Sequence, residues 1–139
     1  PSRSFANESP RQLHDSAIVL KLAFGDTTAL FMSDAELGLE RELLISSKNL
    51  NAEVIKLRHH GSKTSSSEFF LAAVRPRLAM ISAGRRNRYG HPHQEVLDRL
   101  SLLGIQAYRT DEDGDLNFVS DGQRFVRTGD NVDLSRWFW

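Results

Sequence analysis

The chain has 139 residues, of which 40% are hydrophobic and 26% are charged, a composition typical of one compact globular domain. Its 18 basic and 18 acidic side chains balance, so an anion-binding surface has to be local rather than a property of the whole chain. The absence of cysteine excludes disulfide frameworks and thiolate metal sites, which leaves His, Asp and Glu as possible transition-metal ligands. No run of about 18 apolar residues occurs, so we expect a soluble segment without a transmembrane helix.

The first third of the chain predicts a lead-in, a β-hairpin and a helix. Residues 1–13 are rich in proline and serine, and we expect a loose lead-in there. The aliphatic stretches "AIVLKLAF" and "ALFMS" flank the turn sequence "GDTT", which is typical of a hairpin. Asp34 follows the second strand and is a candidate N-cap of a helix over residues 34–47, because acidic residues fill the first turn.

Strands and helices alternate along the rest of the chain. Further strands are expected at residues 53–58, 78–84, 106–110, 116–120 and 124–128. One helix over 68–74 is capped by the serines at 65–67 and closed by Pro76, and a second over 94–104 ends at Gly104. This alternation predicts an α/β fold with a mixed sheet and flanking helices.

Two polar or aromatic stretches near the C-terminus have structural interpretations. The stretch "DEDGD" at residues 111–115 lacks the spacing of an EF-hand loop, and we interpret it as a hairpin turn. The tail over residues 129–139 ends in three aromatic side chains, which are expected to dock on the domain or on a neighbour.

Polar side chains follow four of the predicted strands, and ligands of α/β sheets bind beyond the carboxyl ends of strands. These side chains are Asp34, then His59 and His60, then Asn87, Tyr89 and His91, and finally Thr110 and Asp111. If the strands run parallel, one carboxylate and up to three imidazoles meet at one edge of the sheet. That set of side chains suits a divalent transition metal.

The histidines also have structural interpretations. His59 and His60 face opposite ways if the strand continues through them, because successive side chains alternate, so one binds metal and the other contacts substrate or solvent. His91 precedes a proline and can simply serve a rigid turn. His14 and His93 are interpreted as surface residues. The arginines of the loop that follows, at positions 85, 86 and 88, either face solvent or cradle phosphate oxygens.

Four stretches, in this order, carry a resemblance to a known family. They are "SAIVLKLAFGDTTALFMSDAE", "AEVIKLRHHGSKTSSSEFF", "RPRLAMISAGRRNRYGHPHQEVLDRL" and "GIQAYRTDEDGDL". The series resembles the C-terminal half of the metallo-β-lactamase-like domain of ComEC-type DNA internalisation proteins of natural competence, over roughly residues 14–120. The order of HHGS, NRYGHP and YRTDEDG is far more specific than any one of these motifs.

The resemblance implies a fold and a function. The fold is the C-terminal half of an αβ/βα sandwich, with a partial domain at residues 14–128. The function is that of a metal-dependent nuclease or phosphodiesterase that acts, during DNA uptake, on single-stranded DNA or the strand that is not imported. The parent is expected to be a membrane protein of the cell envelope, with this segment on the outer or periplasmic side of the inner membrane.

The resemblance also implies roles for individual residues. Asp34 matches an aspartate that bridges two divalent ions, zinc or manganese, and His60 is favoured over His59 as a ligand because Ser62 then aligns with related T-H-x-S motifs. His59 and His91 are the expected catalytic residues, which hydrogen-bond the phosphoryl oxygen or protonate the leaving group. The residues expected to contact DNA, mainly through its phosphates, are Ser62, Lys63, Asn87, Arg88 and Tyr89.

Two departures from the family pattern leave the activity open. Ser33 stands where the family has glycine, and the upstream H-x-D-x-D-H cluster does not occur in these residues. Because metal sites normally use three or four ligands, we expect this segment alone to be half a site and inactive. The alternatives are a non-catalytic half-domain that binds or guides DNA, and a hydrolase of another phosphoester on the same fold.

Overall fold

The computed structural model describes residues 18–34, 37–46 and 49–128. The predicted lead-in over residues 1–13, His14 and the aromatic tail over residues 129–139 lie outside the described residues. None of the described helices is both long enough and apolar enough to span a bilayer.

The centre of the fold is a mixed five-stranded sheet with the strand order β1-β2-β3-β4-β5. The strands are β1 (Val19–Phe24), β2 (Thr27–Met32), β3 (Val54–Lys56), β4 (Leu78–Ile81) and β5 (Gln106–Arg109). The first two strands pair antiparallel, which confirms the predicted hairpin, and β2, β3, β4 and β5 all run parallel. The α/β fold with a mixed sheet is therefore as the sequence predicts.

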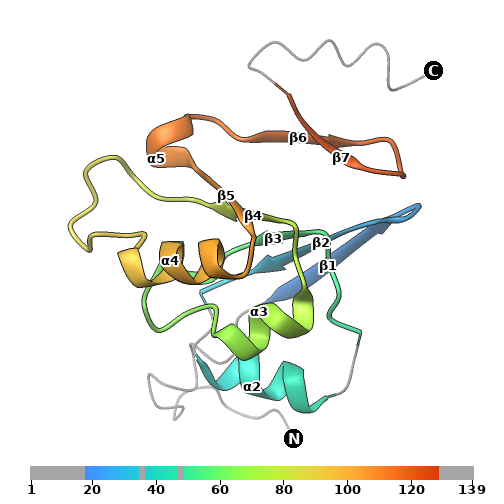
Figure 1. The fold of residues 1–139 in the computed structure, drawn as a ribbon, viewed down its shortest axis with the longest axis horizontal. Helices are drawn as coiled ribbons and strands as arrows, with labels where there is room; N and C mark the ends of the chain where they lie inside the picture. The colour runs from blue at the N-terminus through green and yellow to red at the C-terminus, as the bar shows by residue number, and fades with distance from the viewer. Residues whose placement is uncertain (1–17, 35–36, 47–48, 129–139) are drawn as a thin grey trace, which may run out of the picture.

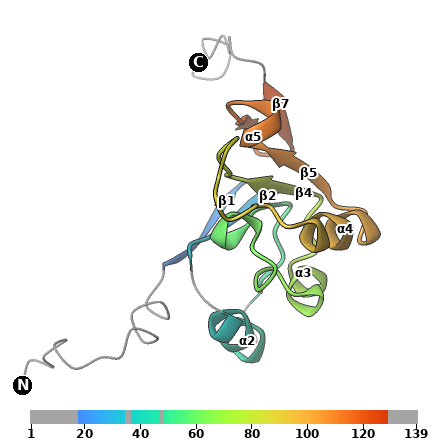
Figure 2. The same cartoon turned by 90° about the vertical axis from the view of Figure 1, so that its left-hand side faces the viewer.

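Three helices cover one face of this sheet, as Figures 1 and 2 show from two directions: α2 (Leu37–Ile45), α3 (Glu68–Val74) and α4 (Gln94–Leu102). The predicted serine cap is confirmed, because the Ser67 hydroxyl accepts a hydrogen bond of 3.3 Å from the Phe70 N–H. The two residues between Asp34 and Leu37 lie outside the described residues, so the N-cap role of Asp34 stays a prediction.

The main core lies between the helices and the sheet. Its strand side chains include Leu30, Ile55 and Ile81, and Phe70 and Leu100 reach it from the helices. All five are at most 2% exposed, and the burial of each such side chain contributes about 1.5–3 kcal/mol. Parallel strands need this cover, because their connections place helices over the sheet.

A second layer lies over the opposite face. The hairpin of β6 (Asn117–Ser120) and β7 (Phe125–Thr128) forms a separate two-stranded sheet, which lies above the central sheet in Figure 1. The Phe118 ring meets the Tyr108 ring of β5 edge to face, with 5.4 Å between the centroids. Both strands agree with the sequence-based prediction.

The stretch at residues 111–115 corrects a prediction, because it begins with a helical turn, α5 (Thr110–Asp113), rather than forming a hairpin turn. The guanidinium of Arg109 forms ion pairs with Asp111 at 2.7 Å and Glu112 at 2.9 Å. The backbone N–H of Arg109 also donates to the Asp113 carboxylate at 2.7 Å. Acidic side chains thus fold back onto the end of β5, which winds the segment into a turn.

The exposed side of β1 leaves an apolar stripe. Leu20 and Leu22 stand opposite Phe31 and Ala29 of β2, which places them on the face that the β6–β7 hairpin covers. Both leucines are nevertheless exposed, as is Phe24 at the end of the strand. The described hairpin therefore covers only part of this face.

The two hairpin turns touch at Gly25 and Gly122. The Asp26 N–H donates to the Gly122 carbonyl at 2.6 Å, and the hydroxyls of Thr27 and Ser120 share a hydrogen bond of 2.7 Å. Gly25 has a φ of +56°, and a Cβ there would lie 2.3 Å from the Gly122 oxygen. No other residue type fits this contact without displacing one hairpin.

We expect Gly25→Ala to lower the free energy of unfolding by about 2–4 kcal/mol, because it combines left-handed strain with a backbone clash. Gly104→Ala is the matched control, since Gly104 has a φ of +68° but nothing within 4 Å of its Cβ position. It should cost only about 1 kcal/mol, from strain alone. Urea unfolding of both variants measures the difference, and equal losses would contradict the close contact.

Candidate functional site

The carboxyl ends of four parallel strands meet at one edge of the sheet, as the sequence analysis required. Asp34 follows β2, His59 and His60 follow β3, and the loop that contains His91 follows β4. No group of three His, Asp or Glu side chains in the described part of the chain is arranged to hold a metal ion. The edge therefore gathers candidate ligands without a complete metal centre among the described residues.

The paired histidines lie in a left-handed turn, not in a strand. β3 ends at Lys56, and the short helical segment η2 (Arg58–Gly61) follows. His59 has φ 46° and ψ 41°, and His60 has φ 55° and ψ 24°. The strand does not continue through the histidines, so the condition under which their side chains would alternate is not met. Non-glycine residues seldom adopt this conformation, and such strain concentrates at functional sites.

Hydrogen bonds hold the turn against the neighbouring loops. The His60 Nδ1 lies 2.5 Å from the Ser82 carbonyl and must donate to it, because a carbonyl oxygen only accepts. In the neutral ring this leaves a lone pair on Nε2. Gly61, with a φ of +78°, packs so closely on Pro92 that a Cβ would lie 2.7 Å from the Pro92 Cβ.

Four imidazoles gather around this turn. The His91 ring centroid lies 5.8 Å from that of His59, 6.3 Å from that of His60 and 4.8 Å from that of His93. His93 is half-buried, so it is not simply a solvent-facing side chain as the sequence suggested. Its ring Nδ1 accepts a hydrogen bond from the backbone N–H of Lys63, and its backbone N–H donates to the Gly61 carbonyl. His93 thus ties the histidine turn to the start of α4.

The surroundings of His91 disfavour its charged form. Burial is the largest cause that lowers its pKa below 6.5, followed by the neighbouring His93, His59 and His60. The lowered pKa therefore favours the neutral His91 ring at physiological pH, and a neutral ring can accept a proton.

The loop between β4 and α4 is closed by one side chain. The Asn87 amide nitrogen donates to the carbonyls of Gly84 at 2.8 Å and His91 at 2.7 Å. Its oxygen accepts the His91 N–H at 2.7 Å. Asn87 is thus engaged within the loop, and its predicted contact with substrate stays a prediction. A cavity of about 210 Å³ is lined by His60, Ala83, Gly84, Asn87, Tyr89 and His91.

The other predicted substrate-binding residues differ in accessibility. Ser62 is buried, and its hydroxyl shares a hydrogen bond of 3.2 Å with that of Thr64. Lys63 and Arg88 are exposed near the histidines. Lys63 and Arg88 therefore remain accessible to an anionic ligand.

Thr110 and Asp111 support the edge from β5. The Thr110 hydroxyl accepts the Ala83 N–H at 2.9 Å and donates to the Ala83 carbonyl at 2.8 Å. Asp111 is committed to Arg109, whose hydrogen bond is the main reason that the pKa of Asp111 is lowered. Thr110 thus holds the start of the loop after β4 in place, whereas Asp111 pairs with the end of β5.

A buried ion pair anchors the segment that contains the histidines. Arg58 Nη1 donates to Glu40 Oε1 at 3.2 Å, and the side chains are 1% and 2% exposed. The same carboxylate accepts the N–H groups of Ser66 at 2.6 Å and Ser67 at 3.0 Å. The sequence analysis did not find this pair, because Glu40 and Arg58 lie 18 residues apart in unrelated elements.

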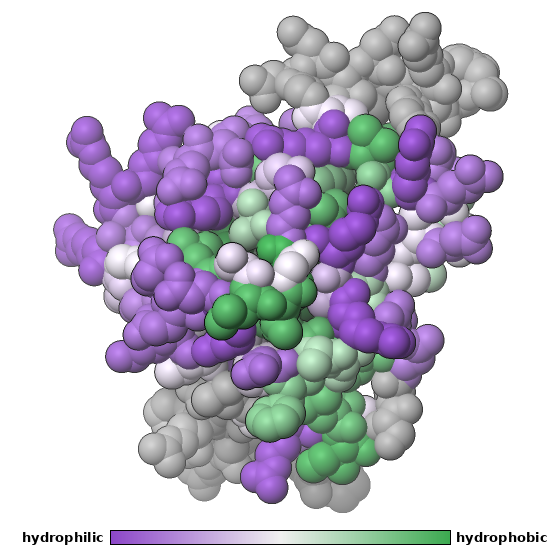
Figure 3. All heavy atoms as spheres, viewed as in Figure 1, coloured by the Kyte–Doolittle hydropathy of each residue, from purple (hydrophilic) through white to green (hydrophobic). Residues whose placement is uncertain are grey.

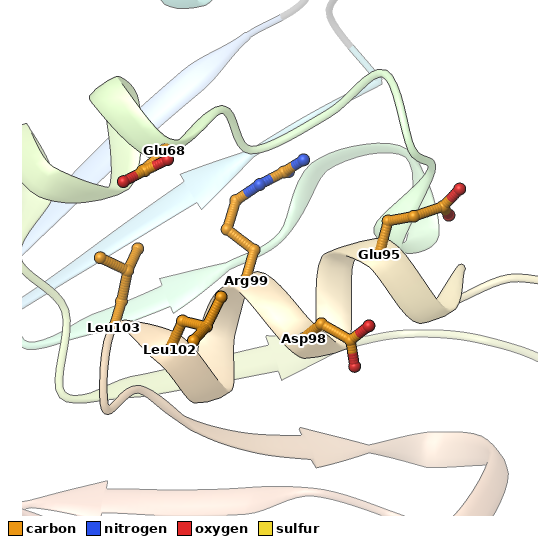
Figure 4. A pocket seen from close by; sticks show the side chains of 6 residues that line it. All are labelled: Glu68, Glu95, Asp98, Arg99, Leu102 and Leu103. Atoms are coloured by element: carbon orange, nitrogen blue, oxygen red, sulfur yellow. The ribbon is translucent and has the colours of Figure 1, made fainter.

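Arg99 holds the same segment from the other side. Its Nη1 donates to the carbonyls of Ser65 at 3.1 Å and Ser66 at 2.8 Å. Figure 4 shows Arg99 extending from α4 beside a hollow of about 520 Å³, whose lining also includes Glu68 of α3. Figure 3 shows hydrophobic side chains gathered near the centre of the face that Figure 1 presents. Leu102, which also lines the hollow, is 88% exposed. The hollow lies along α4, on the helix-covered side of the sheet.

Comparison with known proteins identifies the chain. No family model matches it. It is 38% identical over 109 residues to ComE operon protein 3 of Bacillus subtilis, a match that covers 78% of this chain and 14% of that protein. It is 41% identical over 101 residues to competence protein ComA of Neisseria gonorrhoeae, covering 72% and 15%. It is 33% identical over 117 residues to recombination protein 2 of Haemophilus influenzae, covering 83% and 15%.

The fold and the relatives together define the class and the family of this chain. The fold is an α/β unit whose parallel strands present imidazoles at one edge. Its relatives include two proteins with competence-related names. The chain belongs to the ComEC family, as its motifs predicted, and it spans about one seventh of the length of the relatives it matches.

We expect Glu40→Gln to lower the free energy of unfolding by about 3–5 kcal/mol, because it removes the carboxylate charge that pairs with the buried Arg58 guanidinium. Glu53→Gln is the matched control: Glu53 pairs with Arg77 at 2.6 Å, but the Arg77 side chain is 62% exposed. Its loss should cost less than about 1 kcal/mol. Similar urea midpoints for the two variants would show that the buried pair contributes no more than a surface pair.

Lowering the pH should destabilise the metal-free chain partly through His91. Its folded pKa lies below the unfolded value of 6.5, so below pH 6.5 the unfolded state binds more protons and stability falls. Above pH 6.5, His91 contributes no pH dependence to the free energy of unfolding. His91→Gln should therefore flatten the fall in urea midpoint between about pH 7 and about pH 5. An unchanged slope would contradict the lowered pKa.

Proposed function

We propose that this chain is part of a domain of a DNA-uptake protein, in which it contributes to metal-dependent hydrolysis of DNA phosphodiester bonds. The observation that carries the proposal is the hydrogen bond from His60 Nδ1 to the Ser82 carbonyl. Metal-binding histidines typically donate their second ring N–H in this way, which orients the other nitrogen toward the ion. The competence-related names of two relatives supply the biological setting.

The donor set fits a divalent transition metal. Asp34 supplies carboxylate oxygens and His60 a ring nitrogen at the same edge of the sheet, and both suit zinc or manganese. We propose that these two residues are ligands of a centre that holds two ions in the complete domain. The described residues offer no group of three, so the remaining ligands come from outside them. When bound, the ions would activate a water molecule and polarise the phosphodiester.

The chain's own histidines supply the acid–base chemistry. His91 is held neutral by its surroundings, which suits it to accept a proton or a hydrogen bond near the reacting group. His59, whose ring lies 5.8 Å from that of His91, is the proposed partner in this role. Lys63 and Arg88 are exposed cations beside them and would bind phosphate oxygens, which contributes affinity without sequence preference.

The complete domain is proposed to be an αβ/βα sandwich. The β6–β7 sheet lies over the face opposite the helices, but the apolar side chains of β1 on that face stay exposed. A two-stranded sheet is seldom stable by itself, so further strands would extend it over Leu20 and Leu22.

The complete domain is also proposed to lie on the outer or periplasmic side of the inner membrane, attached to a membrane-anchored parent.

A second function is favoured by one observation. Because no group of three ligands occurs among the described residues, the segment could bind or guide DNA without cutting it. The two candidates differ in metal content and in cleavage, whereas both require that the exposed cations bind DNA.

Metal analysis and DNA cleavage test the proposal on a protein extended upstream to the complete domain. Asp34→Ala and His60→Ala are expected to lower the manganese or zinc content after dialysis and to reduce oligonucleotide cleavage at least about 100-fold, since both residues act on the ions. Asp98→Ala is the control, because Asp98 is exposed on α4 and engaged by Gln94.

Unchanged metal content and cleavage in both variants would contradict the proposed centre. DNA binding without metal or cleavage in the unmodified protein would favour the guiding function instead. Cleavage of small phosphoesters but not of oligonucleotides would replace DNA with another substrate of the same chemistry.

A further inference from the structure

Three aromatic rings line one small cavity beside the histidine turn. The cavity of about 210 Å³ has His60, Tyr89 and His91 among its lining residues. The His60 and Tyr89 rings both lie nearly parallel to the His91 ring, at interplanar angles of 23° and 25° and centroid distances of 6.3 and 5.7 Å. Part of the cavity wall thus consists of ring faces with similar orientations.

Tyr89 is the exposed member of this group. Its side chain is 77% exposed, although tyrosine usually buries its ring and keeps only the hydroxyl in water. It rests on His91, so the ring surface turned away from His91 is open to a flat ligand.

The loop that carries Tyr89 is held in shape before any ligand binds. Asn87 makes three hydrogen bonds to the Gly84 and His91 backbone, which close the loop on both sides of Tyr89. A loop whose backbone is fixed in this way loses little conformational entropy when Tyr89 stacks on a ligand.

The same loop carries unused positive charge. Arg85, Arg86 and Arg88 are exposed and form no ion pair with another residue in the described ranges. An open aromatic ring flanked by free cations is the combination that binds single-stranded nucleic acid, in which bases stack on rings while cations follow the phosphates.

We propose that Tyr89 stacks against an unpaired nucleobase, so that this site takes single-stranded DNA in preference to duplex DNA. The inference rests on the proposed function, because it assumes that the cations of this edge bind DNA. A base inside a duplex already stacks on its neighbours and is not available to Tyr89. Tyr89 thereby determines which form of DNA reaches the histidines.

Binding without metal tests the inference separately from cleavage. Fluorescence anisotropy in the presence of a chelator measures the affinity of this chain for a labelled thymine oligonucleotide of about ten nucleotides. An abasic strand of equal length carries the same phosphates without bases, and a duplex carries bases that are already stacked. Circular dichroism checks that each variant is folded.

Tyr89→Leu is expected to weaken binding of the thymine strand about tenfold or more, since one base–aromatic stack is lost. Tyr89→Phe keeps the ring and should bind within about twofold of the unmodified chain. Neither variant should change binding of the abasic strand or the duplex. Phe69→Leu is the matched control, because Phe69 is 83% exposed on α3 and should not affect any of the strands.

If Tyr89→Leu weakens binding of the abasic strand as much as binding of the thymine strand, or does not weaken binding of the thymine strand, the inference is overturned. The proposed function still stands in that case, because the chain still binds DNA. A loss of the same size in Phe69→Leu overturns the inference too, since any exposed aromatic ring would then serve. Failure of the unmodified chain to bind any of the strands contradicts the proposed function itself, and the stacking role with it.

Discussion

The histidine turn depends on the buried carboxylate of Glu40. This group binds Arg58 directly before the turn and the N–H groups of Ser66 and Ser67 after it. A buried ion pair contributes to stability only when hydrogen bonds satisfy its remaining atoms, and the serine N–H groups meet that requirement for both oxygens. One side chain of α2 therefore fixes both ends of the segment, and the core positions the imidazoles before any ligand arrives.

The parallel sheet explains why loops far apart in sequence meet. β3 delivers the histidine turn, β4 the arginine-rich loop, and β5 the threonine that holds that loop through Ala83. Each contact joins a neighbouring pair of strand ends, so the site is assembled across the sheet instead of within one loop. His93 then closes the arrangement, because it links the start of α4 to Gly61 and Lys63.

Local patterns predicted much of this fold, and long-range contacts account for what they missed. Aliphatic runs located the strands, the serines located the cap of α3, and the motif order identified the family. The left-handed backbone at His59 has only a weak local signal, because few non-glycine residues adopt it, although histidine does so more often than most. The Glu40–Arg58 pair and the winding of residues 110–113 depend on side-chain partners that become visible only once the sheet has formed. His93 directly precedes a predicted helix, but its side chain caps no N–H of that helix and instead accepts a hydrogen bond from Lys63, a contact that the local sequence does not signal.

In the left-handed turn, the residue type that would best stabilise the backbone is not the one that supplies an imidazole. His59 and His60 each hold a backbone conformation that costs about 1–2 kcal/mol in an L-residue, and glycine would adopt it without that cost. A screen that rewards thermal resistance would therefore favour glycine at these positions and remove the imidazoles as it did so. Stability alone therefore does not account for histidine at positions 59 and 60, where glycine would relieve the backbone strain.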